Sequence, residues 1–172
     1  MLWLDNDLII PKQFLSVAIA EMERRRLNCL VAYSNTFFLS EKESLTVMQG
    51  LLKAENATPL SCNSTQKGCR GGAVLVDREW ALSCGGMREE FIGWGGEDDA
   101  WFYYARHFGS VDVTNRSDQD LYHLYHQNSG GYGAGEQIVN NPHYDQNLVL
   151  LRKLMRLRKQ GAVRKEFPIS LP

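Results

Sequence analysis

The sequence predicts an α/β fold, because short apolar segments typical of strands alternate with longer segments whose apolar residues recur at helical spacing. Turn-forming residues separate these segments, and no internal repeat is visible. The chain has 172 residues, of which 44% are hydrophobic and 23% charged, a composition typical of one globular domain. No apolar run approaches the roughly 18 residues of a membrane span. Acidic residues at positions 5 and 7 argue against a cleavable signal peptide.

The first half of the chain contains two predicted strand regions and two predicted helices. Pro11 ends an apolar run that begins at the second residue, and an amphipathic pattern starts directly after it. Ser40 is expected to cap a helix, since Glu43 three residues later completes a capping box. The predicted elements are a strand over residues 2–10, a helix over 12–27, a β-rich segment over 29–39 and a helix from Ser40 to about Lys53.

The second half alternates loops with shorter elements and ends in a long helix, for which Gly161 is a plausible stop. The predicted elements are a polar surface loop over 54–70, a strand over 71–76, a helical turn around Trp80, a glycine-rich loop over 85–96, a helix over 98–108, a short strand at 111–113, a flexible segment at 128–135 and a helix over 144–160. Several aromatic residues are expected in the core or at an interface rather than in a site: Trp3, Trp80, Trp101, Phe102, Tyr103 and Tyr104.

Charge is divided unevenly along the chain. Residues 152–166 contain seven basic side chains and one acidic, while the rest has 12 basic and 19 acidic, giving a total of −1. The near-neutral total excludes a nucleic-acid binder. We therefore predict a main body over residues 1–143 and a basic C-terminal helix and tail over 144–172. The apolar stripe of that helix fits packing on the body, pairing with a second subunit, or contact with an anionic membrane surface.

Two carboxylates follow the first apolar segment, in Asp5-Asn6-Asp7. Alternate residues of a strand share a face, so Asp5 and Asp7 project together if the strand continues through them. Carboxylates are hard oxygen ligands suited to Mg²⁺ or Mn²⁺ holding a diphosphate, although two acids at a strand end also fit a simple turn.

The segment Gly93-Trp94-Gly95-Gly96-Glu97-Asp98-Asp99 places a tryptophan among glycines directly before three acids. Acids at a helix start are favoured by the helix dipole, and glycines alone fit a turn. Neither reason accounts for Trp94, which can stack on an apolar sugar face while a neighbouring carboxylate accepts a hydroxyl proton.

Two histidines lie three residues apart, in His123-Leu124-Tyr125-His126. A helix would place both imidazoles on one side, whereas an extended segment would make them diverge. Histidine pairs bind transition metals, so the pair joined with the aspartates would prefer Mn²⁺-like ions to Ca²⁺. Gly71 and Gly72 precede an apolar strand, where they fit either a close ligand approach to the backbone or a bend.

Taken in order, these motifs resemble the inverting GT-A-fold glycosyltransferases, in particular the C-terminal domain of the β-1,4-galactosyltransferases and its bacterial relatives. The resemblance covers roughly residues 2–127, and its most diagnostic part is the glycine–tryptophan–acid motif. It implies a three-layer α/β/α fold of the nucleotide-diphospho-sugar transferase type, with residues 1–143 as its catalytic and acceptor half. The fold is expected to be truncated, because Met1 stands four residues before Asp5 where the family has its nucleotide-binding βαβ units.

The resemblance also implies roles for individual residues. Asp98 would be the catalytic base, and Asp7, His123 and His126 would hold Mn²⁺ or Mg²⁺. The position of His123 is a methionine in the galactosyltransferases, and Ala100 stands where the family has a further acid. Donor and acceptor binding would fall to Asp5, Gly71, Gly72, Trp94, Gly95, Gly96, Glu97 and Asp99.

The implied activity is metal-dependent transfer of a hexosyl group from a UDP-sugar to a hydroxyl of a carbohydrate or glycoconjugate, with Trp94 and its glycine neighbours as a lid. A non-catalytic carbohydrate-binding or assembly module that kept the acceptor groove is the alternative, favoured by the missing nucleotide half. A metal hydrolase is disfavoured because no third ligand stands at hydrolase spacing. The expected location is the cytoplasm in a bacterium and the Golgi lumen in a eukaryote.

Overall fold

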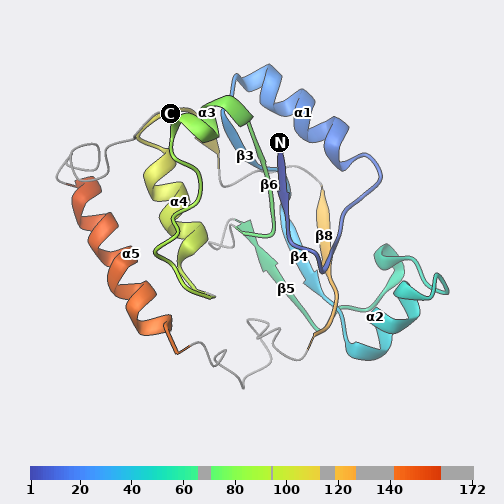
Figure 1. Ribbon diagram of the computed structural model, residues 1–172. Helices are drawn as coiled ribbons and strands as arrows, with labels where there is room; N and C mark the ends of the chain where they lie inside the picture. The colour runs from blue at the N-terminus through green and yellow to red at the C-terminus, as the bar shows by residue number, and fades with distance from the viewer. Residues whose placement is uncertain (66–70, 94, 113–118, 127–141, 160–172) are drawn as a thin grey trace.

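The computed structural model describes residues 1–65, 71–93, 95–112, 119–126 and 142–159 (Figure 1). Its elements are β1 (Leu2–Leu4), β2 (Leu8–Ile9), α1 (Phe14–Arg25), β3 (Cys29–Val31), β4 (Asn35–Phe38), α2 (Glu41–Met48), the 3₁₀ turn η1 (Ala54–Asn56), β5 (Ser61–Ser64), β6 (Ala73–Val76), α3 (Arg78–Ser83), α4 (Glu97–Ala105), β7 (Val111–Asp112), β8 (Asp120–His123) and α5 (Tyr144–Lys159). The predicted flexible segment at 128–135, Trp94 and the tail beyond residue 159 lie outside the described residues.

The described strands form two four-stranded sheets of mixed direction. The first has the strand order β1–β6–β3–β7 and the second has the order β2–β8–β4–β5. In the first sheet β6 is antiparallel to both neighbours and β7 runs parallel to β3. In the second, β8 runs parallel to β4 and antiparallel to β2. Successive strands change sheet between β1 and β2, β2 and β3, β3 and β4, β5 and β6, and β7 and β8.

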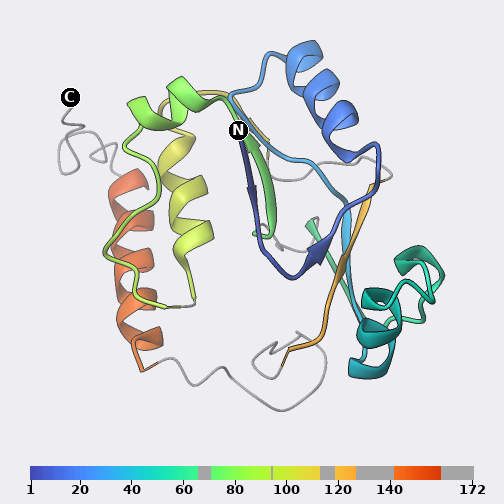
Figure 2. The same cartoon turned by 45° about the vertical axis from the view of Figure 1, so that its right-hand side comes forward.

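Helices cover the first sheet from two sides. Every residue of β3 and β6 is buried, as expected of strands with both faces covered. Figures 1 and 2 show α1 on one side of the strands, and α4 with α5 on the opposite side. Phe14 of α1 and Phe102 of α4 belong to one hydrophobic core that the strands share. The predicted α/β fold is therefore confirmed.

Trp101 is the centre of the aromatic part of this core. It is fully buried, and its ring meets the rings of Trp3 and Trp80 edge-on, with centroid distances of 4.9 and 5.9 Å. The expectation that these tryptophans serve packing is confirmed. Because Trp101 lies in α4 and Trp3 in β1, the cluster fixes the helix against the strand that precedes Asp5.

The helix after β4 has the cap that the sequence predicts. The backbone N–H of Glu43 donates to Ser40 Oγ at 3.1 Å, and Ser40 Oγ donates to a Glu43 carboxylate oxygen at 3.3 Å. The helix ends at Met48 rather than near Lys53, because Gly50 turns the chain in a left-handed conformation with φ of 73°.

Two predictions of local structure are wrong. The run over residues 2–10 is not one strand: Leu2–Leu4 pairs with β6, whereas Leu8–Ile9 pairs with β8 in the other sheet. Residues 61–64 are not loop but form β5, which pairs with β4 alone at the edge of the second sheet. An edge strand needs few apolar residues, so its polar sequence resembled a loop.

The C-terminal helix α5 packs along α4. Leu154 is buried, with 3% of its surface exposed, and Leu148, Leu151 and Met155 are partly buried. The apolar stripe of the helix therefore packs on the body, which is one of the three roles that the sequence allows. None of the described helices combines the length and apolar character needed to cross a lipid bilayer.

Candidate active site

The segment Asp5-Asn6-Asp7 is a turn that joins the two sheets. The backbone N–H of Asp5 donates to the Gly72 carbonyl at 2.8 Å, which ties it to the first sheet. The Asp7 carbonyl accepts a hydrogen bond of 2.8 Å from the N–H of Leu124, which ties it to the end of β8 in the second. The strand stops at Leu4, so the condition under which both carboxylates would share a strand face is not met, and the alternative, a turn, is what the structure has.

Asp7 meets the two histidines that the sequence singled out. One Asp7 carboxylate oxygen lies 3.0 Å from His126 Nε2 and 3.6 Å from His123 Nε2. One ligand atom from each of the three residues fits within 4.8 Å of the others. Three converging N and O donors of this kind can hold a divalent transition metal.

The second Asp7 carboxylate oxygen indicates that this cluster suits a cation. Asp7 Oδ1 is buried and has no hydrogen-bond partner among the described residues. A buried carboxylate oxygen without a partner is costly, and a bound cation removes that cost. The residues present therefore fit the predicted divalent metal.

His123 is oriented as a metal ligand requires. Its Nδ1 lies 2.8 Å from the Leu124 carbonyl oxygen, and since a carbonyl can only accept, Nδ1 must donate. In the neutral ring the lone pair is then on Nε2, the atom that faces Asp7. The His123 ring also stacks on Phe38, with centroids 4.8 Å apart, so its orientation is fixed by packing as well.

The histidine pair takes neither of the two predicted geometries. His123 ends β8 and His126 lies beyond the strand, so the segment is not helical. The rings nevertheless converge, with centroids 5.3 Å apart, because the chain leaves the strand direction after His123. His126 is the more open ligand, with 44% of its side chain exposed.

Gly71 and Gly72 make room for carboxylates of this chain. A Cβ atom at Gly71 would stand 2.0 Å from Asp98 Oδ2, so the Asp98 side chain lies directly over this backbone. Gly72 has φ of 87°, and a Cβ there would meet Leu8 at 3.0 Å and Asp5 Oδ2 at 3.9 Å. The group that approaches the Gly71 backbone is the Asp98 side chain of this chain, and Gly72 forms a bend, which was the other interpretation of the pair.

The Tyr33 hydroxyl donates a hydrogen bond to the Gly71 carbonyl from beneath this backbone. Tyr33 is almost completely buried and lies two residues after the end of β3. The sequence does not reveal this residue, because nothing in a Val-Ala-Tyr-Ser run distinguishes a core tyrosine from one that supports a site.

Asp98 has an altered proton affinity. Burial, and then the neighbouring carboxylates of Glu97, Asp5 and Asp99, raise its pKa from 3.8 to about 7. Each of these causes disfavours the charged form. Burial also raises the pKa of Asp5, and the carboxylates of Asp7 and Glu97 act in the same direction. A carboxylate whose pKa lies near neutrality can accept a proton from a hydroxyl and release it again.

The glycine loop fixes the neighbouring acid, Glu97. The backbone N–H of Gly95 donates to a Glu97 carboxylate oxygen at 2.7 Å. The first turn of α4 consists of Glu97, Asp98 and Asp99. The helix dipole stabilises negative charge at this position, which is the simpler of the two explanations for the three acids. That interpretation does not account for the position of Asp98 over Gly71.

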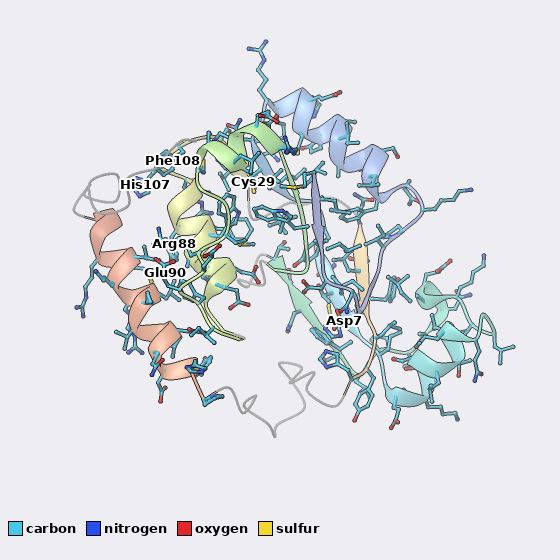
Figure 3. All side chains as sticks on the ribbon, in the orientation of Figure 1. Asp7, Cys29, Arg88, Glu90, His107 and Phe108 are labelled. Carbon is cyan, nitrogen blue, oxygen red and sulfur yellow. The ribbon has the colours of Figure 1, made fainter. Side chains whose placement is uncertain are left out.

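The structure thus brings together residues from four separate parts of the chain: the turn at 5–7, the glycines at 71–72, the start of α4 and the end of β8. Asp5 links the Asp7–His123–His126 cluster to the acids at the start of α4. It interacts electrostatically with Asp7 and His123 in the first group and with Glu97 and Asp98 in the second. Figure 3 shows Asp7 at the end of the strands. Trp94, which the motif placed in the site, lies outside the described residues.

Comparison with known families agrees with the motif that carries most of this site. Residues 54–127 match the family model described as the N-terminal domain of galactosyltransferase. The matched region includes Gly71, Glu97, Asp98 and both histidines, while Asp5 and Asp7 precede it. A search of curated proteins finds no match to the chain. Residues 54–127 are therefore similar to a galactosyltransferase domain, in agreement with the resemblance that the glycine–tryptophan–acid motif carries.

Proposed function

We propose that this protein is a metal-dependent inverting glycosyltransferase that moves a hexosyl group from a UDP-sugar to a hydroxyl of a carbohydrate or glycoconjugate. The observation that carries the proposal is the position of Asp98, a carboxylate with a pKa near 7 that lies over a glycine backbone beside a second acid. The Asp7–His123–His126 cluster adjoins it through Asp5 and supports a donor that carries a diphosphate.

The proposed reaction is a single displacement. Asp98 accepts the proton of the acceptor hydroxyl, and the acceptor oxygen forms a bond to the anomeric carbon of the donor sugar. The bond from that carbon to the diphosphate oxygen breaks, and its electron pair leaves with UDP. Attack from the face opposite the leaving group inverts the anomeric configuration. A positioned general base typically contributes about 10²–10⁴ in rate.

Glu97 and Asp5 have supporting roles in this proposal. The Glu97 carboxylate, held by the Gly95 N–H, is placed to accept hydrogen bonds from acceptor hydroxyls beside the base. Asp5 faces the Gly72 backbone and contributes to the raised pKa of Asp98. Asp99 adds to the same effect from the first turn of α4.

Asp7, His123 and His126 would hold Mn²⁺ or Mg²⁺. When bound, such an ion stabilises the negative charge that develops on a leaving diphosphate. The chain's own contribution is to orient His123 through the Leu124 carbonyl and Phe38, and to keep Asp7 Oδ1 away from competing hydrogen-bond donors.

Calorimetry followed by product analysis tests the proposal. UDP should give binding heat with Mn²⁺ present and little without it. Incubation with α-linked UDP-hexoses and a panel of saccharides should then give a product whose anomeric proton coupling shows a β linkage. Glu79→Gln, which removes an exposed carboxylate far from the site, is the matched control and should behave as wild type.

Two results would contradict the proposal. A product that retains the donor configuration would exclude the single displacement. Saccharide binding with no UDP binding under any metal condition would favour the alternative, a non-catalytic carbohydrate-binding or assembly module.

A further inference from the structure

The C-terminal helix α5 contacts the loop that carries the glycine motif. Figures 1 and 2 both show α5 beside α4, with the loop that leads from α3 into α4 running along this pair. Tyr144, Asn147 and Leu151 are spaced by three and four residues, so they lie on one face of α5. Each of the three meets the loop at a different position between residues 91 and 96.

Asn147 joins α5 to the loop by two hydrogen bonds. Its Nδ2 donates to the Ile92 carbonyl at 3.1 Å, and its Oδ1 accepts from the Ile92 backbone N–H at 3.3 Å. The side chain is almost completely buried, with 2% exposure. The Asn147 amide thus bonds both the N–H and the C=O of Ile92, as a neighbouring strand would. A buried amide is costly unless it is satisfied in this way, which gives Asn147 a reason to stand within an apolar stripe.

Tyr144 and Leu151 lie against the two consecutive glycines, Gly95 and Gly96, that lead into α4. Gly95 has φ of 119°, and a Cβ there would stand 2.6 Å from the Tyr144 ring, so the ring lies directly on the backbone. A Cβ at Gly96 would meet Leu151 at 3.5 Å. The N–H of Gly95 in turn holds the Glu97 carboxylate. Three contacts on one helix face thus determine where the segment leading to Glu97 and Asp98 lies.

We infer that Asn147 is a positioning residue, through which α5 holds the loop at 91–96 so that Glu97 and Asp98 face the acceptor. The role in acceptor binding rests on the proposed function. The contact by which Asn147 holds the loop does not depend on that function. Loss of Asn147 should loosen the loop and weaken acceptor binding. Donor binding should change little, because the metal-ligating residues belong to β2, β8 and the turns beside them.

The test compares Asn147→Leu with Leu154→Ala. The first keeps a similar side-chain volume and removes both hydrogen bonds to Ile92. The second disturbs the buried packing of the same helix two turns further on, without removing those bonds. Hydrogen exchange of the ligand-free protein should show at least tenfold faster exchange at the Ile92 amide in Asn147→Leu. Leu154→Ala should not single out this amide.

Kinetics supply the second measurement. Asn147→Leu should raise the acceptor KM about tenfold while the donor KM stays within twofold of wild type. Leu154→Ala should leave the ratio of the two KM values unchanged. Unchanged exchange at Ile92, or the same acceptor effect in both variants, would overturn the inference.

The outcomes for the two proposals are separable. If wild type transfers no sugar, the proposed function fails, while the exchange measurement still decides whether Asn147 holds the loop. If wild type transfers sugar and Asn147→Leu keeps its acceptor KM, the positioning role fails alone. If Asn147→Leu does not fold, Asn147→Ala carries the same two measurements, because it removes the same two hydrogen bonds to Ile92 with a smaller side chain.

Discussion

Two aspartates two residues apart, Asp5 and Asp7, belong to chemically different clusters. Asp7 faces two imidazoles, with His126 Nε2 at 3.0 Å, and its other oxygen is buried without a partner among the described residues. Asp5 faces the Gly72 backbone; burial and then the carboxylates of Asp7 and Glu97 raise its pKa, against a lowering by His123, and burial with the neighbouring acids raises the pKa of Asp98. A carboxylate among nitrogen donors is a ligand, whereas a carboxylate among carboxylates is driven toward the protonated form and suits proton transfer.

This contrast shows that the neighbours decide the role of each acid. Each cluster contains an aspartate of the same short turn, but one surrounds it with imidazoles and the other with carboxylates. The turn at Asn6 directs one acid to each, so a single change of backbone direction separates the proposed cation-binding half of the site from the proposed proton-transfer half. Four measurements test this division, beginning with the largest expected effect.

Removing the base should nearly abolish the reaction. Asp98→Asn keeps the size of the side chain and removes its ability to accept the hydroxyl proton, so transfer should fall by about 10²–10⁴. UDP binding in the presence of Mn²⁺ should persist, because the Asp7 cluster is intact. Turnover assays and calorimetry on the same preparation check both halves, and normal turnover in this variant would remove Asp98 from the role of base.

Removing a proposed metal ligand should weaken metal binding by the Asp7–His123–His126 cluster. Asp7→Asn and His126→Ala should each lower Mn²⁺ affinity at least ~100-fold, since loss of an outer partner of a ligand alone typically costs about 10–100-fold. Titration followed by electron paramagnetic resonance of free Mn²⁺ measures the affinity. His143→Ala is the matched control, because this histidine lies outside the cluster. Equal affinity in His126→Ala and wild type would contradict the assignment.

The rate should depend on pH through the ionisation of Asp98. With a pKa of about 7, the carboxylate is mostly charged at pH 8 and about one-tenth charged at pH 6. The acceptor kcat/KM should therefore rise about tenfold from pH 6 to pH 8, at saturating Mn²⁺ and UDP-sugar. Bound Mn²⁺ must be measured at each pH, because histidine ligands also lose metal in acid. A flat profile at constant occupancy would separate Asp98 from the rate-limiting proton transfer.

The smallest effect is on stability, and its sign is opposite to the effect on rate. The pKa of Asp98 is raised from 3.8 to about 7 on folding, so the folded protein binds this proton more tightly than the unfolded chain. The free energy of unfolding therefore falls as pH rises from about 4 to 7. In metal-free protein, Asp98→Asn should be more stable than wild type at pH 8 by about 1–3 kcal/mol.

Thermal melts at two pH values check this sign. The gain from Asp98→Asn should be present at pH 8 and nearly absent at pH 4, where the native carboxyl is already protonated. A variant that is less stable than wild type at pH 8 would show that the ionised carboxylate has stabilising partners.

The sequence predicts the elements whose signals are local. The helix after Pro11, the Ser40 cap, the strand after Gly72 and the helix from Tyr144 each have a pattern or a capping residue within their own segment. The chemistry of the site is local in the same sense, because the motif at 93–99 and the histidine pair stand out by residue type.

What the sequence does not predict depends on distant partners. Nothing in the run from Leu2 to Ile9 reports that its two ends pair with strands of different sheets. His123 and His126 converge because the chain leaves the strand direction at the end of β8. Neither a helix nor a continuous extended segment predicts this arrangement. The role of Asn147 is visible only from its hydrogen bonds to Ile92, 55 residues away in the chain.

The crossing of the chain between the two sheets at residues 5–7 has a mechanical consequence. The acids proposed for proton transfer are linked to the first sheet through the hydrogen bond from Asp5 to Gly72. The proposed metal ligands flank strands of the second sheet: Asp7 precedes β2, His123 ends β8 and His126 lies beyond it. A donor bound to one half and an acceptor bound to the other would add a non-covalent crossing between the sheets. Occupancy of both should then raise the melting temperature of the whole protein by more than either ligand alone, as expected when substrates bridge separately anchored parts of a folded state.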